Sequence, residues 1–131
     1  MGQLIKAPPT VLVVEDEALV NWEIADALIA DGFGVLQAYT GEQALALLEK
    51  RSDVRVVFSD INLPGKIDGI ALAAEIERRW PTVELLMTSA ERWPDADRIP
   101  AISQYGRFVP KPYPVGAVTR RIHDIVSERA A

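Results

Sequence analysis

Residues 55–65 read RVVFSDINLPG. A run of strand-forming apolar residues ends abruptly in Asp60, and a Pro-Gly turn signal follows it. The pattern predicts a buried strand over residues 54–59 that carries Asp60 at its carboxyl end. In open α/β sheets, ligands and chemistry collect at that edge. Taken alone, such an Asp is more often a cap of the following turn, so residues elsewhere in the chain must decide its role.

The composition of the chain limits the classes of protein to which it can belong. Its 131 residues are enough for one domain with a core of its own. The absence of cysteine excludes disulfides, thiolate nucleophiles and cysteine metal sites. A net charge of -5 argues against direct nucleic-acid binding, which needs a positive face. No apolar run is long enough for a membrane span, and the N-terminus lacks the layout of a signal peptide. We therefore expect a cytoplasmic protein that binds no membrane.

Strand-like and helix-like patterns alternate along the chain. We expect a disordered lead-in over residues 1–9 and one domain over residues 10–131. The expected strands cover residues 11–14, 33–39, 54–59, 83–88 and 108–109. Helical spacing follows each strand, although prolines interrupt residues 91–106, where we expect at most a short helix. The alternation predicts an α/β fold, a doubly wound, five-stranded parallel sheet with helices on both faces.

Three local signals place helix ends. Gly32 has the position of a C-cap glycine after the first helix. Thr40 and Gln43 form a capping-box pattern at the start of the second helix. The third helix should stop at Trp80, because the next residue is proline.

Chemically active side chains follow four of the five expected strands. The carboxyl ends of parallel strands share one edge, which should bring together Glu15, Asp16, Asp60, Ser89 and Lys111. Each of them alone has an ordinary structural explanation, but together they indicate a functional site. Three carboxylates in one cleft repel one another, so they favour a hard cation such as Mg²⁺. A lysine beside them is suited to bind phosphate as a point charge.

These segments resemble the receiver domain of two-component response regulators. The resemblance rests on residues 13–17, 60–65, 88–90 and 108–113, in the order and spacing of that family, and it covers about residues 10–128. It implies a flavodoxin-like fold with strand order 2-1-3-4-5. It also implies that Asp60 accepts a phosphoryl group from a phosphohistidine donor.

The resemblance implies roles for the neighbours of Asp60. Glu15 and Asp16 would hold Mg²⁺ together with Asp60 and the backbone carbonyl of Asn62. Glu15 departs from the commoner Asp of the family but keeps the charge.

The resemblance also implies a phosphate contact and a switch. Ser89 and Lys111 would contact the phosphoryl group, and Ser89 with Phe108 would form the conformational switch. The bond between Lys111 and Pro112 would be cis, as is usual at that position. The sequence departs from the family pattern in two places that bear on its output signal. The loop over residues 64–69 is one residue longer than usual, and the fourth helix is irregular.

The resemblance implies protein partners. A histidine kinase or a histidine phosphotransfer protein would be the donor, with a downstream protein partner after it, and weak dimerisation is compatible with the pattern. Trp22 and Asn21, on the first helix, would contact a partner. We expect no DNA-binding output domain.

Two alternatives come from other functional classes. One is an enzyme with an aspartyl nucleophile, such as a phosphatase; it would need an acid where Asn62 stands. The other is an adaptor that works without phosphorylation. We expect no enzyme activity beyond self-catalysed phosphorylation and dephosphorylation of Asp60.

Overall fold

The computed structural model describes residues 8–90 and 107–130. Within them, the sheet contains five parallel strands in the order β2-β1-β3-β4-β5. The elements are, along the chain, β1 (Thr10–Val14), α1 (Ala18–Ala30), β2 (Gly34–Ala38), α2 (Gly41–Lys50), β3 (Val54–Asp60), α3 (Gly69–Arg79), β4 (Glu84–Ser89), β5 (Phe108–Pro110) and α5 (Val115–Ala130).

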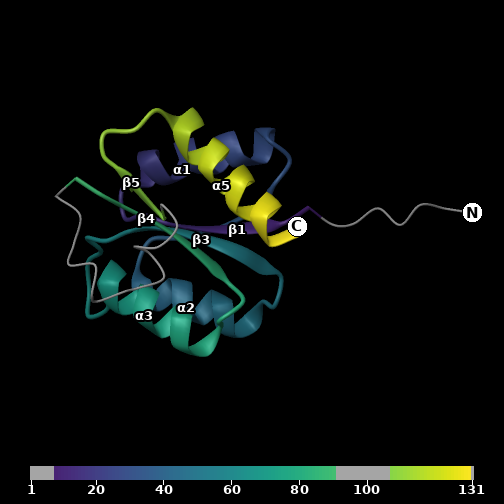
Figure 1. Ribbon diagram of the computed structural model, residues 1–131. Helices are drawn as coiled ribbons and strands as arrows, with labels where there is room; N and C mark the ends of the chain where they lie inside the picture. Colours follow the sequence, from purple (N-terminus) through teal and green to yellow (C-terminus); the bar gives the residue numbers. More distant parts are fainter. Residues whose placement is uncertain (1–7, 91–106, 131) are drawn as a thin grey trace, which may run out of the picture.

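The sheet forms the middle of three layers. Helices α1 and α5 cover one face, and α2 and α3 cover the other (Figure 1). Strand β1 is buried along its whole length, and its side chains alternate between the two faces. Val11 and Val13 pack toward α1 and α5, whereas Leu12 and Val14 pack toward α2 and α3. This burial on both sides explains the continuous apolar run in the sequence.

The predicted fold class and strand order are confirmed. All five strands form where the sequence predicts them, with each end within one residue of the expected position. Strand β3 extends one residue further than expected, so Asp60 itself pairs with Thr88 in the sheet. The predicted lead-in over residues 1–9 lies largely outside the described residues, and so does the segment 91–106.

The predicted helix ends are also confirmed. The helix-terminating Gly32 has a positive φ of 93°, which glycine adopts at little cost. The Thr40 hydroxyl accepts a hydrogen bond from the Gln43 amide at 3.0 Å. The Gln43 side chain reaches back to the Tyr39 amide at 2.8 Å, which completes the cap. Helix α3 ends at Trp80, as the following proline requires.

Gly69 allows α3 to begin directly against the backbone that follows Asp60. Its amide donates to the Ile61 carbonyl at 2.7 Å. A Cβ atom at this position would overlap the Asp60 carbonyl oxygen and the Ile61 Cα. Only glycine therefore fits here, and this close approach ties the first turn of α3 to the strand end that carries Asp60.

Gly69→Ala should lower the free energy of unfolding by about 2–3 kcal/mol, because the added methyl group meets backbone that cannot turn away. Urea unfolding followed by circular dichroism measures this. Gly116→Ala is the matched control, since nothing lies within 4 Å of a Cβ there and α5 should lose little or gain stability. Equal effects of the two variants would contradict the close-approach argument.

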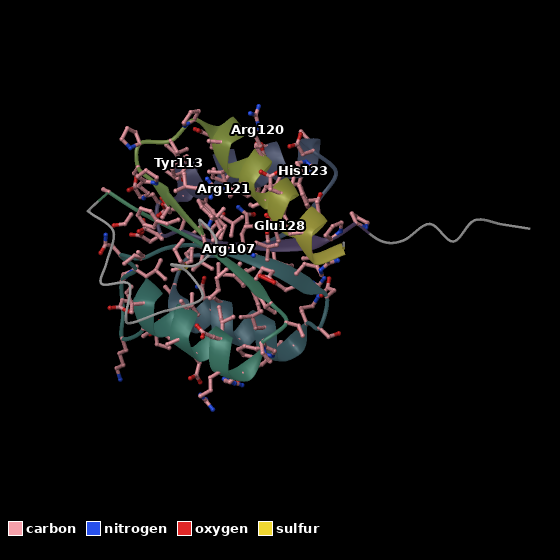
Figure 2. The ribbon with its side chains drawn as sticks, in the orientation of Figure 1. Arg107, Tyr113, Arg120, Arg121, His123 and Glu128 are labelled. Atoms are coloured by element: carbon pink, nitrogen blue, oxygen red, sulfur yellow. The ribbon has the colours of Figure 1, made fainter. Side chains whose placement is uncertain are left out.

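Helix α5 is tied to the rest of the domain at its middle and near its C-terminal end. The Arg107 guanidinium is buried and lies 3.2 Å from a Glu84 carboxylate oxygen and 3.7 Å from one of Glu128 (Figure 2). His123 packs its ring against Phe33, with ring centroids 4.7 Å apart, and lies 3.3 Å from Asp31. The described part of the chain contains no helix long and apolar enough to cross a membrane.

Candidate functional site

The carboxyl edge of the sheet brings the predicted residues together. Strand β1 delivers Glu15 and Asp16, β3 ends at Asp60, β4 ends at Ser89, and Lys111 follows β5. One oxygen from each of the three acids lies within 4.8 Å of the other two. Glu15 and Asp60 are buried, whereas Asp16 is exposed at the rim. The three carboxylates thus form a compact acidic cluster that opens to solvent on one side.

Lys111 provides the positive charge of the cluster. Its ammonium group lies 2.6 Å from Asp60 Oδ2 and 3.0 Å from Glu15 Oε1. The backbone supports this placement, since the Lys111 amide donates to the Ser89 carbonyl at 3.0 Å. The bond between Lys111 and Pro112 is cis, as the sequence predicts. One cation therefore bridges acids that come from two different strands.

Burial and the neighbouring charges shift the pKa values of Glu15 and Lys111. Burial raises the pKa of the Glu15 carboxyl above its ordinary value, and hydrogen bonds from the Glu17 amide and Lys111 offset only part of this. Burial opposes the charge of Lys111, but the two carboxylates outweigh it and raise the pKa of the lysine. Lys111 is therefore firmly protonated at neutral pH.

Asn62 links Asp60 to Ser89. Its backbone amide donates to Asp60 Oδ1 at 2.9 Å, and its side-chain amide donates to the Ser89 hydroxyl at 3.2 Å. The neighbouring Thr88 hydroxyl is committed elsewhere, because it donates to the Val109 carbonyl at 2.6 Å. Ser89 is thus the hydroxyl that faces the cluster. The sequence predicts a role only for the backbone carbonyl of Asn62, so the hydrogen bond of its side chain was not foreseen.

Asn21 was predicted to contact a partner, and that prediction is wrong for this conformation. The side chain is fully buried, so no partner can reach it. Its amide group donates to the carbonyls of Glu15 and Ala38, both at 3.0 Å, and it accepts from Gln37 at 2.8 Å. Asn21 therefore joins α1 and the end of β2 to the backbone of Glu15, and so positions an acid of the cluster.

Asn21→Ala should lower the free energy of unfolding by about 2–3 kcal/mol, because it removes two donors from buried carbonyls. Gln37→Ala is the matched control, since it removes only one partly buried hydrogen bond and should cost about 1 kcal/mol. Urea titrations of both variants give the comparison. An Asn21→Ala variant no less stable than Gln37→Ala would show that the buried network contributes little.

Two aromatic residues, Trp22 and Phe108, were also predicted to have roles, in partner binding and in the switch. Trp22 is 52% exposed on the outer side of α1, where a partner can reach it. Phe108 is partly buried and packs against the core on the side of α2 and α3. Its proposed movement as a switch stays a prediction.

Comparison with known proteins decides the family. The sequence model described as the response regulator receiver domain matches residues 11–123. The chain belongs to this receiver-domain family. The matched span contains all of the acidic cluster together with Ser89 and Lys111.

Relatives of this receiver include regulators and a kinase. It is 29% identical to the DNA-binding transcriptional regulator NtrC of Salmonella typhimurium over 119 residues, which covers 89% of this chain and 24% of that protein. It is 30% identical to the sensor kinase CckA of Brucella abortus over 122 residues, which covers 92% of this chain and 13% of that protein. The chain thus spans a quarter or less of these two relatives.

Solved receiver structures share the fold. The receiver domain of NtrX from Brucella abortus is 29% identical, with a TM-score of 0.74, and the match covers 89% of this chain and 98% of that one. A receiver domain protein from Clostridium thermocellum has a TM-score of 0.79 at 22% identity, covering 92% and 96%, and this likeness supports the fold alone.

Membership of the receiver-domain family indicates the general chemistry of the chain. Receiver domains belong to two-component systems, bind Mg²⁺ at an acidic pocket and interact with histidine kinases or phosphotransfer proteins. The cluster of Glu15, Asp16 and Asp60 is compatible with that metal.

Proposed function

We propose that Asp60 accepts a phosphoryl group from the phosphohistidine of a histidine kinase or a phosphotransfer protein, in a reaction that depends on Mg²⁺, and that the chain then signals through protein contacts. The observation that best supports this is the position of Lys111, 2.6 Å from Asp60 and 3.0 Å from Glu15. A lysine fixed on the reacting carboxylate is also in contact range of any group that the carboxylate receives.

The charge and the donor atoms of the cluster fit a divalent cation. Three carboxylates and one ammonium group leave a formal charge of −3 + 1 = −2. All of the candidate ligands are oxygen atoms, which a hard cation such as Mg²⁺ prefers. The ligands would be Glu15, Asp16, Asp60 and the carbonyl of Asn62. When bound, the cation would supply positive charge to the oxygens of the incoming phosphoryl group.

The protein's share of the reaction is positioning and electrostatics. One oxygen of the Asp60 carboxylate forms a bond to phosphorus while the phosphorus–nitrogen bond to the donor imidazole breaks. The electron pair of that bond stays on the imidazole nitrogen. Asn62 holds the Asp60 carboxylate in orientation through its backbone amide. Lys111 stabilises the negative charge that accumulates on the transferred oxygens.

The same contacts supply a route to signalling. Once Asp60 carries a phosphoryl group, Lys111 and the Ser89 hydroxyl have new oxygens to bind. The Ser89 hydroxyl accepts a hydrogen bond from the Asn62 side chain, and a movement of Ser89 toward the phosphoryl group would alter this contact. Phe108, which pairs with Met87 across the neighbouring strands, would respond to that movement. In this proposal, the switch joins the site to the surface around β4 and β5.

A phosphatase-type enzyme is less well supported by the geometry. That reaction needs a general acid beside the aspartyl nucleophile. Asn62 occupies the corresponding position, and its side chain donates to Ser89. An amide cannot give up a proton to a leaving group at neutral pH, so we favour self-catalysed phosphorylation and dephosphorylation of Asp60 over turnover of a separate substrate.

A phosphotransfer assay against a panel of autophosphorylated histidine kinases tests the proposal. We expect rapid transfer from at least one kinase when Mg²⁺ is present, and a large loss of transfer when a chelator removes it. Turnover of a simple phosphomonoester by the chain, with no labelled protein intermediate, would favour the enzyme alternative instead.

A further inference from the structure

A buried amide group continues the connection between β1 and β2 past the end of the sheet. Val14 and Ala38 are the last paired residues of the two strands, and the Glu15 amide donates to the Ala38 carbonyl at 3.1 Å. The Asn21 side chain, fully buried near the start of α1, donates from its nitrogen to the carbonyls of both Glu15 and Ala38 at 3.0 Å. Asn21 thus holds the backbone of Glu15 where the sheet has ended.

The orientation of the Asn21 amide group is set from two sides. Both carbonyls can only accept hydrogen bonds, so the amide nitrogen must face them. On the other side, the Gln37 side chain donates to Asn21 Oδ1 at 2.8 Å. Gln37 lies on β2, an edge strand of the sheet, and is partly exposed. The network therefore runs from the surface of the domain to the backbone of a buried acid of the cluster.

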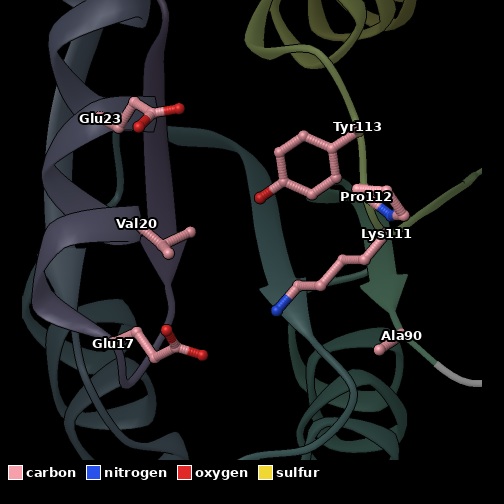
Figure 3. Close-up of a pocket in the computed structure, with 7 residues that line it drawn as sticks. All are labelled: Glu17, Val20, Glu23, Ala90, Lys111, Pro112 and Tyr113. Carbon is pink, nitrogen blue, oxygen red and sulfur yellow. The ribbon is translucent and has the colours of Figure 1, made fainter.

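Glu15 is fixed at its carboxylate as well as at its backbone. Oε1 lies 3.0 Å from the Lys111 ammonium group, and Oε2 accepts from the Glu17 amide at 3.1 Å. Lys111 extends toward α1 from the loop that joins β5 to α5 (Figure 3). The Glu17 side chain lines a pocket of about 510 Å³ between α1 and that loop (Figure 3).

This fixation matters for a glutamate in particular. Glutamate has one more side-chain torsion than aspartate, and ordering a side chain costs entropy when a ligand binds. A backbone and a carboxylate that are already in place lower that cost. The contacts of Asn21 therefore bear on how strongly the cluster can hold a cation.

We propose that Asn21 and Gln37 are positioning residues that set the affinity of the acidic cluster for its divalent cation. Asn21 acts through the Glu15 backbone rather than through a ligand oxygen, and Gln37 acts through Asn21. Removal of outer groups that orient a metal ligand commonly weakens metal binding by about ten- to a hundredfold. The inference rests on the proposed function for the use of the cluster as a cation site.

A titration of the full chain, labelled with ¹⁵N, with Mg²⁺ measures this affinity without any phosphoryl transfer. Amide shifts of Asp60 and Asn62 report the occupancy of the cluster. Asn21→Ala should weaken Mg²⁺ binding by about tenfold, because the Glu15 and Ala38 carbonyls lose the group that holds them together. Wild-type affinity in this variant would contradict the role of Asn21.

Val118→Ala separates positioning from general stability. It removes buried methyl groups from α5, in the core on the side of the sheet that α1 also covers, and so destabilises the fold outside the network. It should keep the wild-type affinity for Mg²⁺ at a temperature at which circular dichroism shows every variant to be folded. Equal losses of affinity in Val118→Ala and Asn21→Ala would overturn the proposal.

Two variants of Gln37 test the network with Asn21 left in place, so they also decide the case in which Asn21→Ala does not fold. Gln37→Glu replaces the donor with a carboxylate, which repels Asn21 Oδ1 and competes for the amide nitrogen. It should weaken Mg²⁺ binding by about two- to tenfold, which corresponds to the net worth of one hydrogen bond. Gln37→Lys still offers a donor to Oδ1 and should bind Mg²⁺ nearly as the wild type does.

Charge alone predicts the opposite order, because an added negative charge attracts Mg²⁺ and an added positive charge repels it. Gln43→Glu is the matched control: it adds the same charge at the start of α2, where a carboxylate can still accept from the Tyr39 amide. It should not weaken Mg²⁺ binding. Tighter binding in Gln37→Glu than in Gln37→Lys would overturn the proposal.

The titration also distinguishes this inference from the proposed function. Saturable Mg²⁺ binding with the same affinity in the wild type, Asn21→Ala and Gln37→Glu would contradict the positioning role alone. A wild-type chain whose Asp60 and Asn62 amides do not respond to Mg²⁺ would contradict both. The expected order of affinities in a chain that no kinase labels would count against phosphoryl transfer alone.

Discussion

Asp60→Asn should abolish phosphorylation of the chain by a phosphodonor in the presence of Mg²⁺. Asparagine keeps the size of the side chain and can still accept a hydrogen bond from the Asn62 amide. Its uncharged amide is not a nucleophile toward phosphorus, however, and it removes one of the three negative charges that favour a cation. Acid-labile labelling followed on gels measures the effect.

Asp124→Asn is the control for this experiment, because it removes an exposed carboxylate from α5, away from the cluster. It should be labelled like the wild type. Stable labelling of Asp60→Asn would contradict the assignment of Asp60 as the phosphoacceptor. Unfolding curves of the two variants should remain cooperative, so that loss of labelling is not confused with loss of the fold.

Lys111→Ala should retain some phosphorylation but lose the conformational response to it. The nucleophile and the three carboxylates remain, whereas the cation that joins Asp60 to Glu15 is gone. Amide chemical shifts before and after phosphorylation report the response. We expect shifts in the wild type to extend to the strands around Phe108, and those in the variant to stay local to Asp60.

The same variant should be less stable without metal, by about 1–3 kcal/mol, because two buried carboxylates lose their partner. The carboxylates raise the pKa of Lys111, so its contribution to stability is present below its ordinary pKa and is lost only as strongly alkaline pH passes the raised value. Lys66→Ala, in the exposed loop after β3, is the matched control and should change little. A wild-type response in Lys111→Ala would contradict its role as the link to the switch.

The sequence predicted the sheet and the cluster because both depend on simple patterns. Strands buried on two faces need nearly continuous apolar runs, and the carboxyl ends of parallel strands lie at one edge. Glu15, Asp60 and Lys111 therefore meet for reasons of topology alone. Capping residues such as Thr40 act within a single turn, so their partners are also visible in the sequence.

Asn21 shows where the sequence argument failed. Like Trp22, it was predicted to contact a partner from the first helix. Its spacing from Ile24, Ala25 and Leu28 is nevertheless that of one helix face, and all four residues are buried together. The helical spacing of Asn21 is a better guide to its burial than its polar side chain is. Its hydrogen-bond partners could not be predicted, because they depend on how α1 sits against β2.

Other features of the site depend on distances that no local pattern encodes. The need for glycine at position 69 arises from the approach of α3 to the backbone after Asp60. The pocket between α1 and the β5–α5 loop joins segments that are far apart in the chain. The irregular segment 91–106, with its expected short helix, lies outside the described residues.

In the proposed function, Asp60 receives the phosphoryl group of a phosphohistidine. Mass-spectrometric mapping of the intact chain after transfer from an autophosphorylated kinase tests it most directly, with Mg²⁺ present and with the metal chelated. We expect a single phosphoryl group, located on Asp60 and formed only with the metal. A phosphoryl group on Asp16 or Ser89 instead, or equal labelling without metal, would contradict it.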